Sequence, residues 1–288
     1  MIPVSIVSIG ADALRTMNST PKPVAILGAG NIGTAIADGI VESGCLPPSD
    51  VLLTRRRREL LAPFERRGFV VLSDNQEAAR RAPLLVVAVE PQQIDGLLEE
   101  IGPRLRPGTH IVVSVVSGVS IAEIKRRLPS GVAVVRAMPN TAVAIRESMT
   151  CLAAQGSDRK AIEAVQPIFD ALGPTLVLDE EQMIAATVLG ACGIAFFLRA
   201  IRAASQGGIE IGLHTEEALL IASQTARGAA TLLLNRKHHP EHEIDRVTTP
   251  RGCTIAGLNR MEHAGFSSAL IRGIISSAEK AGRLYKKE

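Results

Sequence analysis

The fold is decided by the stretch Val24-Ala25-Ile26-Leu27-Gly28-Ala29-Gly30-Asn31-Ile32-Gly33-Thr34-Ala35, where a short apolar run enters a GxGxxG motif. Gly28 permits a tight turn, Gly30 lets the backbone approach a pyrophosphate, and Gly33 lets the following helix pack closely on the strand. The first helix also offers its free N–H groups to phosphates. The sequence therefore predicts a dinucleotide-binding loop formed by Gly28, Gly30, Asn31, Ile32 and Gly33.

The end of the predicted second strand indicates which dinucleotide is bound. An NAD-binding unit usually places a carboxylate there for the ribose hydroxyls, about 20 residues past the loop. Here Thr54 is followed by Arg55, Arg56, Arg57 and Arg58, with no carboxylate before Glu59. Since arginine forks match phosphate oxygens, we expect NADPH, held at its 2′-phosphate by Thr54, Arg55 and Arg56, and only weaker binding of NADH. A solvated face is the alternative, and we favour it for Arg57 and Arg58.

Composition narrows the class of protein. The chain has 288 residues, 46% of them apolar and 2% aromatic, with a net charge of +3, so nothing demands nucleic acid or a membrane. The four cysteines have no CxxC spacing, which favours a reducing cytoplasm. We expect no membrane span, because no uninterrupted apolar run reaches the roughly 18 residues required. Residues 1–22 are predicted to be a disordered extension, or a mis-started one, since Met17 lies just before the first strand.

The chain divides into two regions. Up to about residue 179, β-rich runs alternate with helical patterns, which predicts an α/β Rossmann domain over residues 23–179 with a doubly wound, mostly parallel sheet. From Glu180 the periodicity is helical, which predicts an all-helical domain over residues 180–288. The predicted strands are Val24–Leu27, Val51–Thr54, Val70–Leu72, Leu84–Val89, Ile111–Ser114, Val132–Ala137, Met149–Ala154 and Leu176–Leu178, and the long helices are Ala185–Gln206, Thr215–Leu234 and Phe266–Arg283. Helices this rich in Ala and Gly favour an intertwined homodimer.

Four motifs in order carry a family resemblance: the Gly28–Gly33 loop, Ala88–Pro91, Arg136–Thr141 with its Met-Pro-Asn-Thr, and Val247–Leu258 with its Thr-Pro-x-Gly-x-Thr. From Val24 to the C-terminus the chain resembles the pyrroline-5-carboxylate reductases. The resemblance implies NADPH-dependent reduction of 1-pyrroline-5-carboxylate to L-proline, a helical domain that makes a homodimer, and possible rings of dimers. Two alternatives stay open: a related imine or keto-acid reductase with another substrate, and a non-catalytic NADPH-binding paralogue.

The resemblance also implies site residues. Thr254 is the expected catalytic residue and hydrogen-bonds the imine nitrogen, while Glu180, Gly252 and Cys253 lie at the substrate. The residue types in this turn agree with a substrate site. Gly252 allows close backbone approach, and the N–H groups around Gly252–Thr254 can hold a substrate carboxylate. Thr254 is alternatively a plain N-cap of a helix beginning near Ile255. The positions expected to line the cofactor are Asn75, Ala88, Val89, Pro91 and Asn140.

Several of these residues have simpler interpretations. Glu180 is alternatively a helix N-terminal carboxylate, and Asn140 a turn former after Pro139. We expect no metal at His238–His242, because Pro240 breaks a helix there. Cys253 as a nucleophile and Arg146 as a substrate clamp are both disfavoured.

The chain departs from the family pattern at three places. Glu90 stands where lysine is usual, Arg251 where a second glycine is usual, and Gly190–Ala195 replaces a Ser-Gly-Ser-Gly-Pro-Ala segment. A carboxylate beside a phosphate-bearing cofactor is unfavourable unless it points away or pairs with an arginine. We therefore expect Glu90 to do one of these, and we expect Gly190, Ala191 and Gly193 to keep close helix approach possible.

Overall fold

The computed structural model describes residues 21–236 and 238–283. The predicted N-terminal extension lies almost wholly outside these residues. By contacts the chain forms two units, one containing the residues up to Ala191 and those from Ala278 onward, the other Cys192–Ser277. The boundary expected at residues 179 and 180 stays a prediction.

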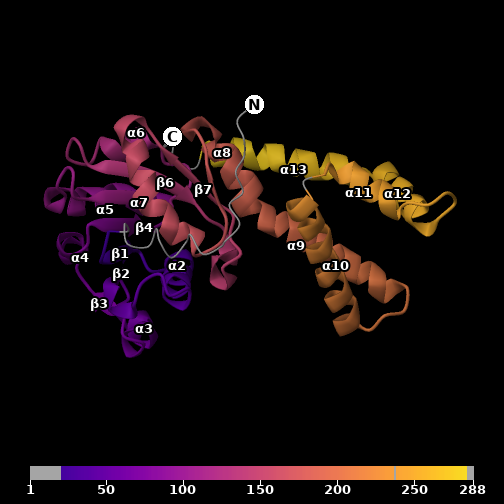
Figure 1. The fold of residues 1–288 in the computed structure, drawn as a ribbon, viewed down its shortest axis with the longest axis horizontal. Coiled ribbons are helices and arrows are strands. Elements are labelled where there is room, and N and C mark those ends of the chain that lie inside the picture. Colours follow the sequence, from indigo (N-terminus) through magenta and orange to yellow (C-terminus); the bar gives the residue numbers. More distant parts are fainter. Residues whose placement is uncertain (1–20, 237, 284–288) are drawn as a thin grey trace. The chain divides into compact units, whose positions relative to one another are not determined.

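The first unit is built on one eight-stranded sheet with strand order β3-β2-β1-β4-β5-β6-β7-β8 (Figure 1). All neighbouring strands are parallel except β6 and β7. The first six strands thus have the order of a dinucleotide-binding sheet, which confirms the predicted fold class. The strands are β1 (Val24–Leu27), β2 (Val51–Thr54), β3 (Val70–Leu72), β4 (Leu84–Val87), β5 (Ile111–Ser114), β6 (Ala133–Met138), β7 (Thr150–Ala154) and β8 (Thr175–Val177).

Helices cover both faces of this sheet. Side chains alternate along β1, so that Val24 and Ile26 join one apolar cluster with α2 and α7, while Ala25 and Leu27 join another with α4, α5 and α6. Burial on both faces explains why the strands read as continuous apolar runs. The helices are α2 (Asn31–Glu42), α3 (Ala62–Arg66), α4 (Asn75–Arg81), α5 (Ile94–Ile101), α6 (Ile121–Lys125), α7 (Arg159–Asp170) and α8 (Met183–Ala186), with the short helical turns η4 (Pro91–Gln93), η6 (Thr141–Ile145), η8 (Glu180–Gln182) and η9 (Thr187–Cys192).

The second unit is helical, as the sequence predicts. It contains α9 (Gly193–Glu210), α10 (Thr215–Arg236), α11 (Pro240–Val247), α12 (Cys253–His263) and most of α13 (Phe266–Ala281). Helices α9 and α10 approach closely at Gly208, where an added Cβ would lie 3.2 Å from the Cβ of Ala218. Small residues therefore do permit close packing here. The sequence did not predict α11, which is short, and it placed the start of α12 near Ile255, two residues later than the observed Cys253.

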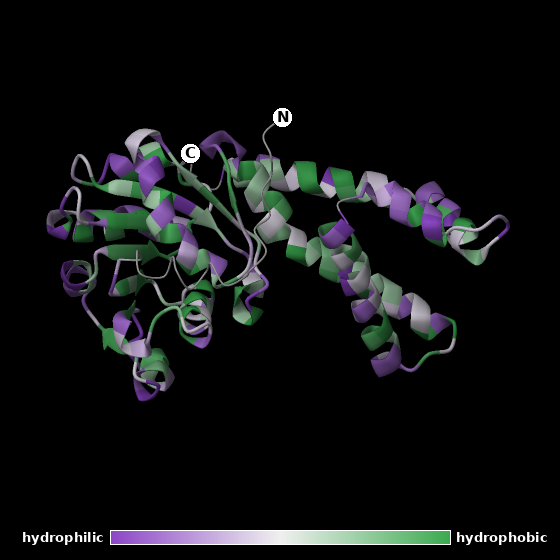
Figure 2. Ribbon diagram, viewed as in Figure 1, coloured by the Kyte–Doolittle hydropathy of each residue, from purple (hydrophilic) through white to green (hydrophobic). Residues whose placement is uncertain are grey.

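The helical unit exposes much apolar surface within one chain. Phe197, Leu220 and Ile211 are 60%, 71% and 84% exposed, and Figure 2 shows apolar residues recurring along α9, α10 and α13. By length and composition the helical stretch Glu180–Glu210 is apolar enough to cross a membrane, with 17% of its apolar window buried. The sequence analysis counted only uninterrupted apolar runs and so did not single out this stretch, and the expectation of no membrane span stays a prediction.

Candidate active site

The glycine loop has the backbone geometry that its three glycines predict. Gly28 has a φ of +92°, and a Cβ there would lie 2.8 Å from the carbonyl oxygen of Ala88. A Cβ on Gly33 would lie 2.7 Å from the carbonyl oxygen of Gly28. Apart from Gly30 itself, its chain neighbours and the adjoining helix backbone, no described atom lies within 4 Å of the position of a Cβ on Gly30. Gly28 and Gly33 are thus required by the fold, whereas Gly30 faces open space.

That open space lies in front of the N-terminus of α2. The N-cap of α2 is Gly30, which has no side chain to bind the first-turn N–H groups, and the first turn contains no acidic residue. The N–H groups of Asn31, Ile32 and Gly33 precede the first intrahelical bond, which Thr34 donates to Gly30, so they are free to bind an anion. The space at Gly30 is open because glycine has no side chain, and it lies next to free N–H groups. Such a space fits the pyrophosphate of a dinucleotide.

A chain of side-chain hydrogen bonds stands at the end of β2. The Thr54 hydroxyl donates to Asn75 Oδ1 at 2.6 Å, and Asn75 Nδ2 donates to Glu100 Oε2 at 3.0 Å. The Thr54 carbonyl oxygen also accepts the N–H groups of Gly28 and Ala29. Thr54 and Asn75, both expected at the cofactor, are therefore brought together beside the glycine loop. The sequence did not predict Glu100, which lies 25 residues from Asn75.

The arginines after β2 differ in environment. Arg55 is half-buried and Arg56 exposed, and among the described residues neither makes a hydrogen bond or ion pair that would occupy its guanidinium. Arg57 is exposed, and Arg58 pairs with Glu65 at 3.1 Å with both side chains more than half exposed. The solvated interpretation thus suits Arg57 and Arg58.

The segment after β4 borders the glycine loop. Ala88 donates its N–H to the carbonyl oxygen of Leu27, and Val89 Cγ1 lies 2.5 Å from the position of a Cβ on Gly28. Pro91 begins η4. Glu90 is exposed and forms no ion pair within the described part of the chain, so its carboxylate has no arginine partner there.

Asn140 is fixed at both ends of its amide. Its Oδ1 accepts the N–H of Ala142 and caps η6, while its Nδ2 donates to the carbonyl oxygen of Gly190 at 3.2 Å. Gly190 lies in η9, a π-helical turn of the kind that often marks functional sites. The turn-former interpretation is therefore correct, and a role in cofactor binding stays a prediction.

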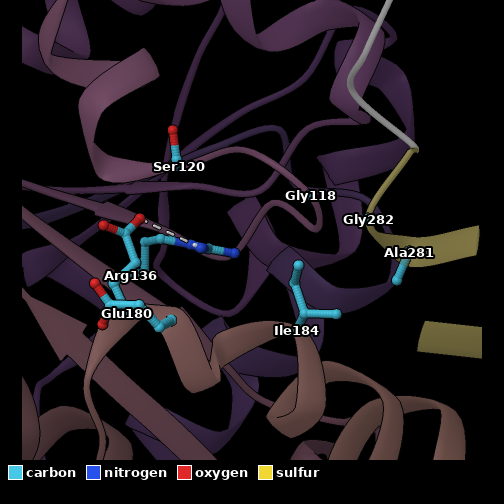
Figure 3. Close-up of a pocket in the computed structure, with 8 residues that line it drawn as sticks. Gly118, Ser120, Arg136, Glu180, Ile184, Ala281 and Gly282 are labelled. Atoms are coloured by element: carbon cyan, nitrogen blue, oxygen red, sulfur yellow. Dashed lines mark hydrogen bonds and ion pairs between the residues drawn. The ribbon is translucent and has the colours of Figure 1, made fainter. Parts of the chain in front are cut away.

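A pocket of about 250 Å³ contains the predicted substrate residue Glu180. Figure 3 shows the Arg136 guanidinium extending between Gly118 and Ile184, with the Glu180 carboxylate beside it. Arg136 Nη1 lies 3.4 Å from Glu180 Oε1, and that oxygen also accepts the N–H of Ile121 at 2.5 Å. The Glu180 carboxylate therefore caps the N-terminus of α6, while its backbone lies in the first turn of η8. The lining residues are Gly118, Ser120, Arg136, Glu180, Glu181, Ile184, Ala281 and Gly282.

The Thr-Pro-x-Gly-x-Thr turn differs from its prediction in detail. Helix α12 begins at Cys253 with Gly252 as N-cap, so Thr254 is inside the first turn and is not a cap. The left-handed residue is Arg251, with a φ of +59°, at the position where the family usually has glycine. A Cβ on Gly252 would lie 2.6 Å from Thr249 Oγ1, so the close approach predicted for Gly252 is present. Cys253 is exposed.

The histidine motif has a different backbone from the predicted surface turn. Pro240 begins α11 instead of breaking a helix, and ligand atoms of His238, His242 and Glu243 lie within 4.8 Å of one another. Hydrogen bonding to His238, opposed by some burial and assisted by nearby arginines, lowers the pKa of Glu243. Arg236 and Arg246 both lie within 4.0 Å of this carboxylate, which makes the cluster a poor cation site. Arg146 is exposed, in a left-handed turn.

Comparison with known proteins identifies the family. Residues 180–284 match the protein family described as "Pyrroline-5-carboxylate reductase dimerisation". Residues 23–118 match the family described as "NADP oxidoreductase coenzyme F420-dependent". Pyrroline-5-carboxylate reductase 1 of Dictyostelium discoideum is 52% identical over 91% of this chain, which spans half the length of that relative. Pyrroline-5-carboxylate reductase 2 of the same organism is 47% identical, over 91% of this chain and 93% of the relative.

A solved structure confirms the fold. The pyrroline carboxylate reductase of Plasmodium falciparum, crystallised with NADP, is 23% identical and superimposes with a TM-score of 0.82 over 91% of this chain and 98% of that one. Identity at this level supports the fold alone, whereas the Dictyostelium relatives support membership. The chain belongs to the pyrroline-5-carboxylate reductase family.

Proposed function

We propose that this protein reduces 1-pyrroline-5-carboxylate to L-proline with NADPH, the last step of proline biosynthesis. The observation that carries the proposal is the 47% identity to a pyrroline-5-carboxylate reductase that is matched over 93% of its length. The Thr249–Leu258 segment adds weight, since a non-catalytic paralogue has no need to keep a substrate turn. The alternative of a related imine or keto-acid reductase rests only on the departures at Glu90 and Gly190–Ala195.

The Rossmann unit is the proposed cofactor site. The N–H groups of Asn31, Ile32 and Gly33 would hold the pyrophosphate in the open space at Gly30. Arg55 and Arg56 bind the 2′-phosphate and so favour NADPH over NADH. Thr54 contributes as an acceptor, because its hydrogen is already donated to Asn75. Asn75, Ala88, Val89, Pro91 and Asn140 line the remainder. The relative bound to NADP and the NADP oxidoreductase match support a phosphorylated dinucleotide.

The substrate residues are Thr254, Gly252, Cys253 and Glu180. Backbone N–H groups of the Gly252–Thr254 turn bind the substrate carboxylate, and the Thr254 hydroxyl hydrogen-bonds the ring nitrogen. Glu180 supplies a negative charge that favours the protonated imine. When bound, the cofactor would supply a hydride for the C5 carbon of the substrate, and the π electrons of the C=N bond would pass to the ring nitrogen, which already carries its proton. The protein's contribution is mainly alignment and charge complementarity.

A homodimer through the C-terminal helices is part of the proposal. The dimerisation match covers residues 180–284, the same region that exposes Phe197 and Leu220. Burial of these helices against a second copy removes their apolar faces from water. Rings of such dimers and a cytoplasmic location complete the proposal.

Turnover of purified protein with pyrroline-5-carboxylate tests this function directly. Loss of reduced nicotinamide absorbance is followed with NADPH and, separately, with NADH. Rapid oxidation with a preference for NADPH, and proline as the product, is the expected result. Binding of NADPH without turnover on this substrate would contradict the proposal and would direct the search to other imines.

A further inference from the structure

Arg136 is a charged residue in the middle of a core strand. On β6 it follows Val135 and precedes Ala137, both fully buried, and is itself 5% exposed. Burial lowers the pKa of its guanidinium, and the Glu180 carboxylate acts in the opposite direction. Burying an ion costs several kcal/mol unless it is well paired. Such a residue on the sheet therefore requires a reason beyond packing.

The pairing of Arg136 is incomplete. Its contact with Glu180 is a single one, 3.4 Å long, whereas a bidentate arginine and carboxylate pair has two bonds of about 2.7–2.9 Å. Arg136 Nε is buried with no hydrogen-bond partner in the part of the chain that the structure describes. Because Figure 3 shows the guanidinium reaching into the pocket, Arg136 holds Glu180 from the pocket side.

Glu180 is held by three donors from separate elements. Arg136 comes from β6, the Ile121 N–H comes from α6, and Gln155 Nε2, just after β7, donates to the other carboxylate oxygen. Only 10% of the Glu180 side chain is exposed. These donors occupy three of the carboxylate's roughly four acceptor sites, which fixes its direction and leaves about one site for a ligand.

We propose that Arg136 is a positioning residue for imine reduction, which holds the Glu180 carboxylate in the pocket toward the protonated nitrogen of the substrate. The inference rests on the proposed function. In this proposal the effect of Arg136 on the imine nitrogen is exerted through Glu180. Loss of Arg136 therefore weakens recognition of the imine and leaves binding of NADPH unchanged.

Arg127 provides a matched control. It is also a partly buried arginine with an unpartnered Nε, and it pairs with Asp95 at 2.7 Å, but it does not line the pocket. Wild type, Arg136→Met, Arg136→Lys and Arg127→Met are compared by Tm, Kd for NADPH from fluorescence, and kcat and KM for pyrroline-5-carboxylate. We expect Arg136→Met to lower kcat/KM by about 10- to 100-fold, mostly through KM. Arg136→Lys restores part of the loss because it keeps the charge.

A double mutant separates positioning from stability. Arg136→Met combined with Glu180→Gln should lose little more than the worse single variant, because both remove one interaction. Equal kcat/KM for Arg136→Met and Arg127→Met, or losses that multiply in the double variant, would overturn the inference. Wild type that binds NADPH but does not reduce the substrate would overturn the proposed function instead. If Arg136→Met does not fold, Gln155→Ala removes a donor from the more exposed side of Glu180, and unchanged KM in both Gln155→Ala and Arg136→Lys would also refute the inference.

Discussion

Substitution of Gly30 by alanine separates cofactor binding from folding. Beyond its own chain neighbours, a Cβ on Gly30 meets no described atom within 4 Å, whereas a Cβ on Gly28 would lie 2.5 Å from Val89 Cγ1 and 2.8 Å from a backbone oxygen. The φ of Gly28 is also +92°, while Gly30 has an ordinary φ of −84°. We therefore expect Gly30→Ala to fold normally and bind NADPH poorly, and Gly28→Ala to destabilise the protein.

The expected magnitudes follow from these contacts. A side chain at positive φ costs about 1–2 kcal/mol, and overlap with fixed neighbours adds about 1–3 kcal/mol. For Gly28→Ala this predicts a fall in Tm of about 4–20 °C. For Gly30→Ala, a weaker N-cap and reduced freedom of the unfolded chain offset each other to within about 1 kcal/mol. A methyl group in the cradle displaces the pyrophosphate from at least one N–H, so the Kd for NADPH should rise about 10-fold or more.

Thermal unfolding and fluorescence titration with NADPH measure both effects on the same samples. Gly96→Ala is the control, since Gly96 in α5 also has open space at its Cβ and lies outside the predicted cofactor residues. Its Kd should match that of wild type. A folded Gly30→Ala that binds NADPH as tightly as wild type would refute the placement of the pyrophosphate over Gly30.

Three further substitutions address cofactor choice, chemistry and assembly. Arg55→Ala with Arg56→Ala should raise the Kd for NADPH about 100-fold and that for NADH less than about 3-fold; equal weakening of both would exclude a 2′-phosphate role. Thr254→Ala should lower kcat by roughly 10- to 1000-fold with NADPH affinity retained, and normal turnover would remove Thr254 from the mechanism. Leu220→Glu places a charge on a side chain that is 71% exposed in one chain. Light scattering should show its dimer dissociating at concentrations where wild type stays assembled, and an unchanged mass would place Leu220 outside the interface.

Local patterns in the sequence predicted most of the fold. All eight strands occur within two residues of their predicted bounds. Short apolar runs and a glycine loop can be recognised from a few neighbouring residues, so they do not depend on distant contacts. The antiparallel pairing of β7 was not predicted, since strand direction depends on the connection and not on the strand's own residues. The start of α12 at Cys253 was missed because Gly252, not the more typical Thr254, is the N-cap.

The sequence predicted which residues belong to the site, but not which residues they form hydrogen bonds with. Glu180 was expected at the substrate, yet its donors Ile121 and Arg136 are 59 and 44 residues away. Glu100 was missed for the same reason, since its link to Asn75 joins two helices. A charged residue inside an apolar strand was the available signal for Arg136. Such a residue is rarely tolerated in a core unless it is paired, and the partner becomes visible only in three dimensions.

The helical region shows why an apolar pattern alone does not reveal what covers it. A helix that is apolar on most sides is buried in a core, in a membrane or against another chain. Arg199 and Arg202 interrupt the apolar run of α9, yet the stretch still satisfies the length and composition of a membrane span. The match of residues 180–284 to a dimerisation domain favours another chain as the cover. The same side chains that resemble a membrane span in the sequence are therefore the ones expected to lie at the centre of the dimer.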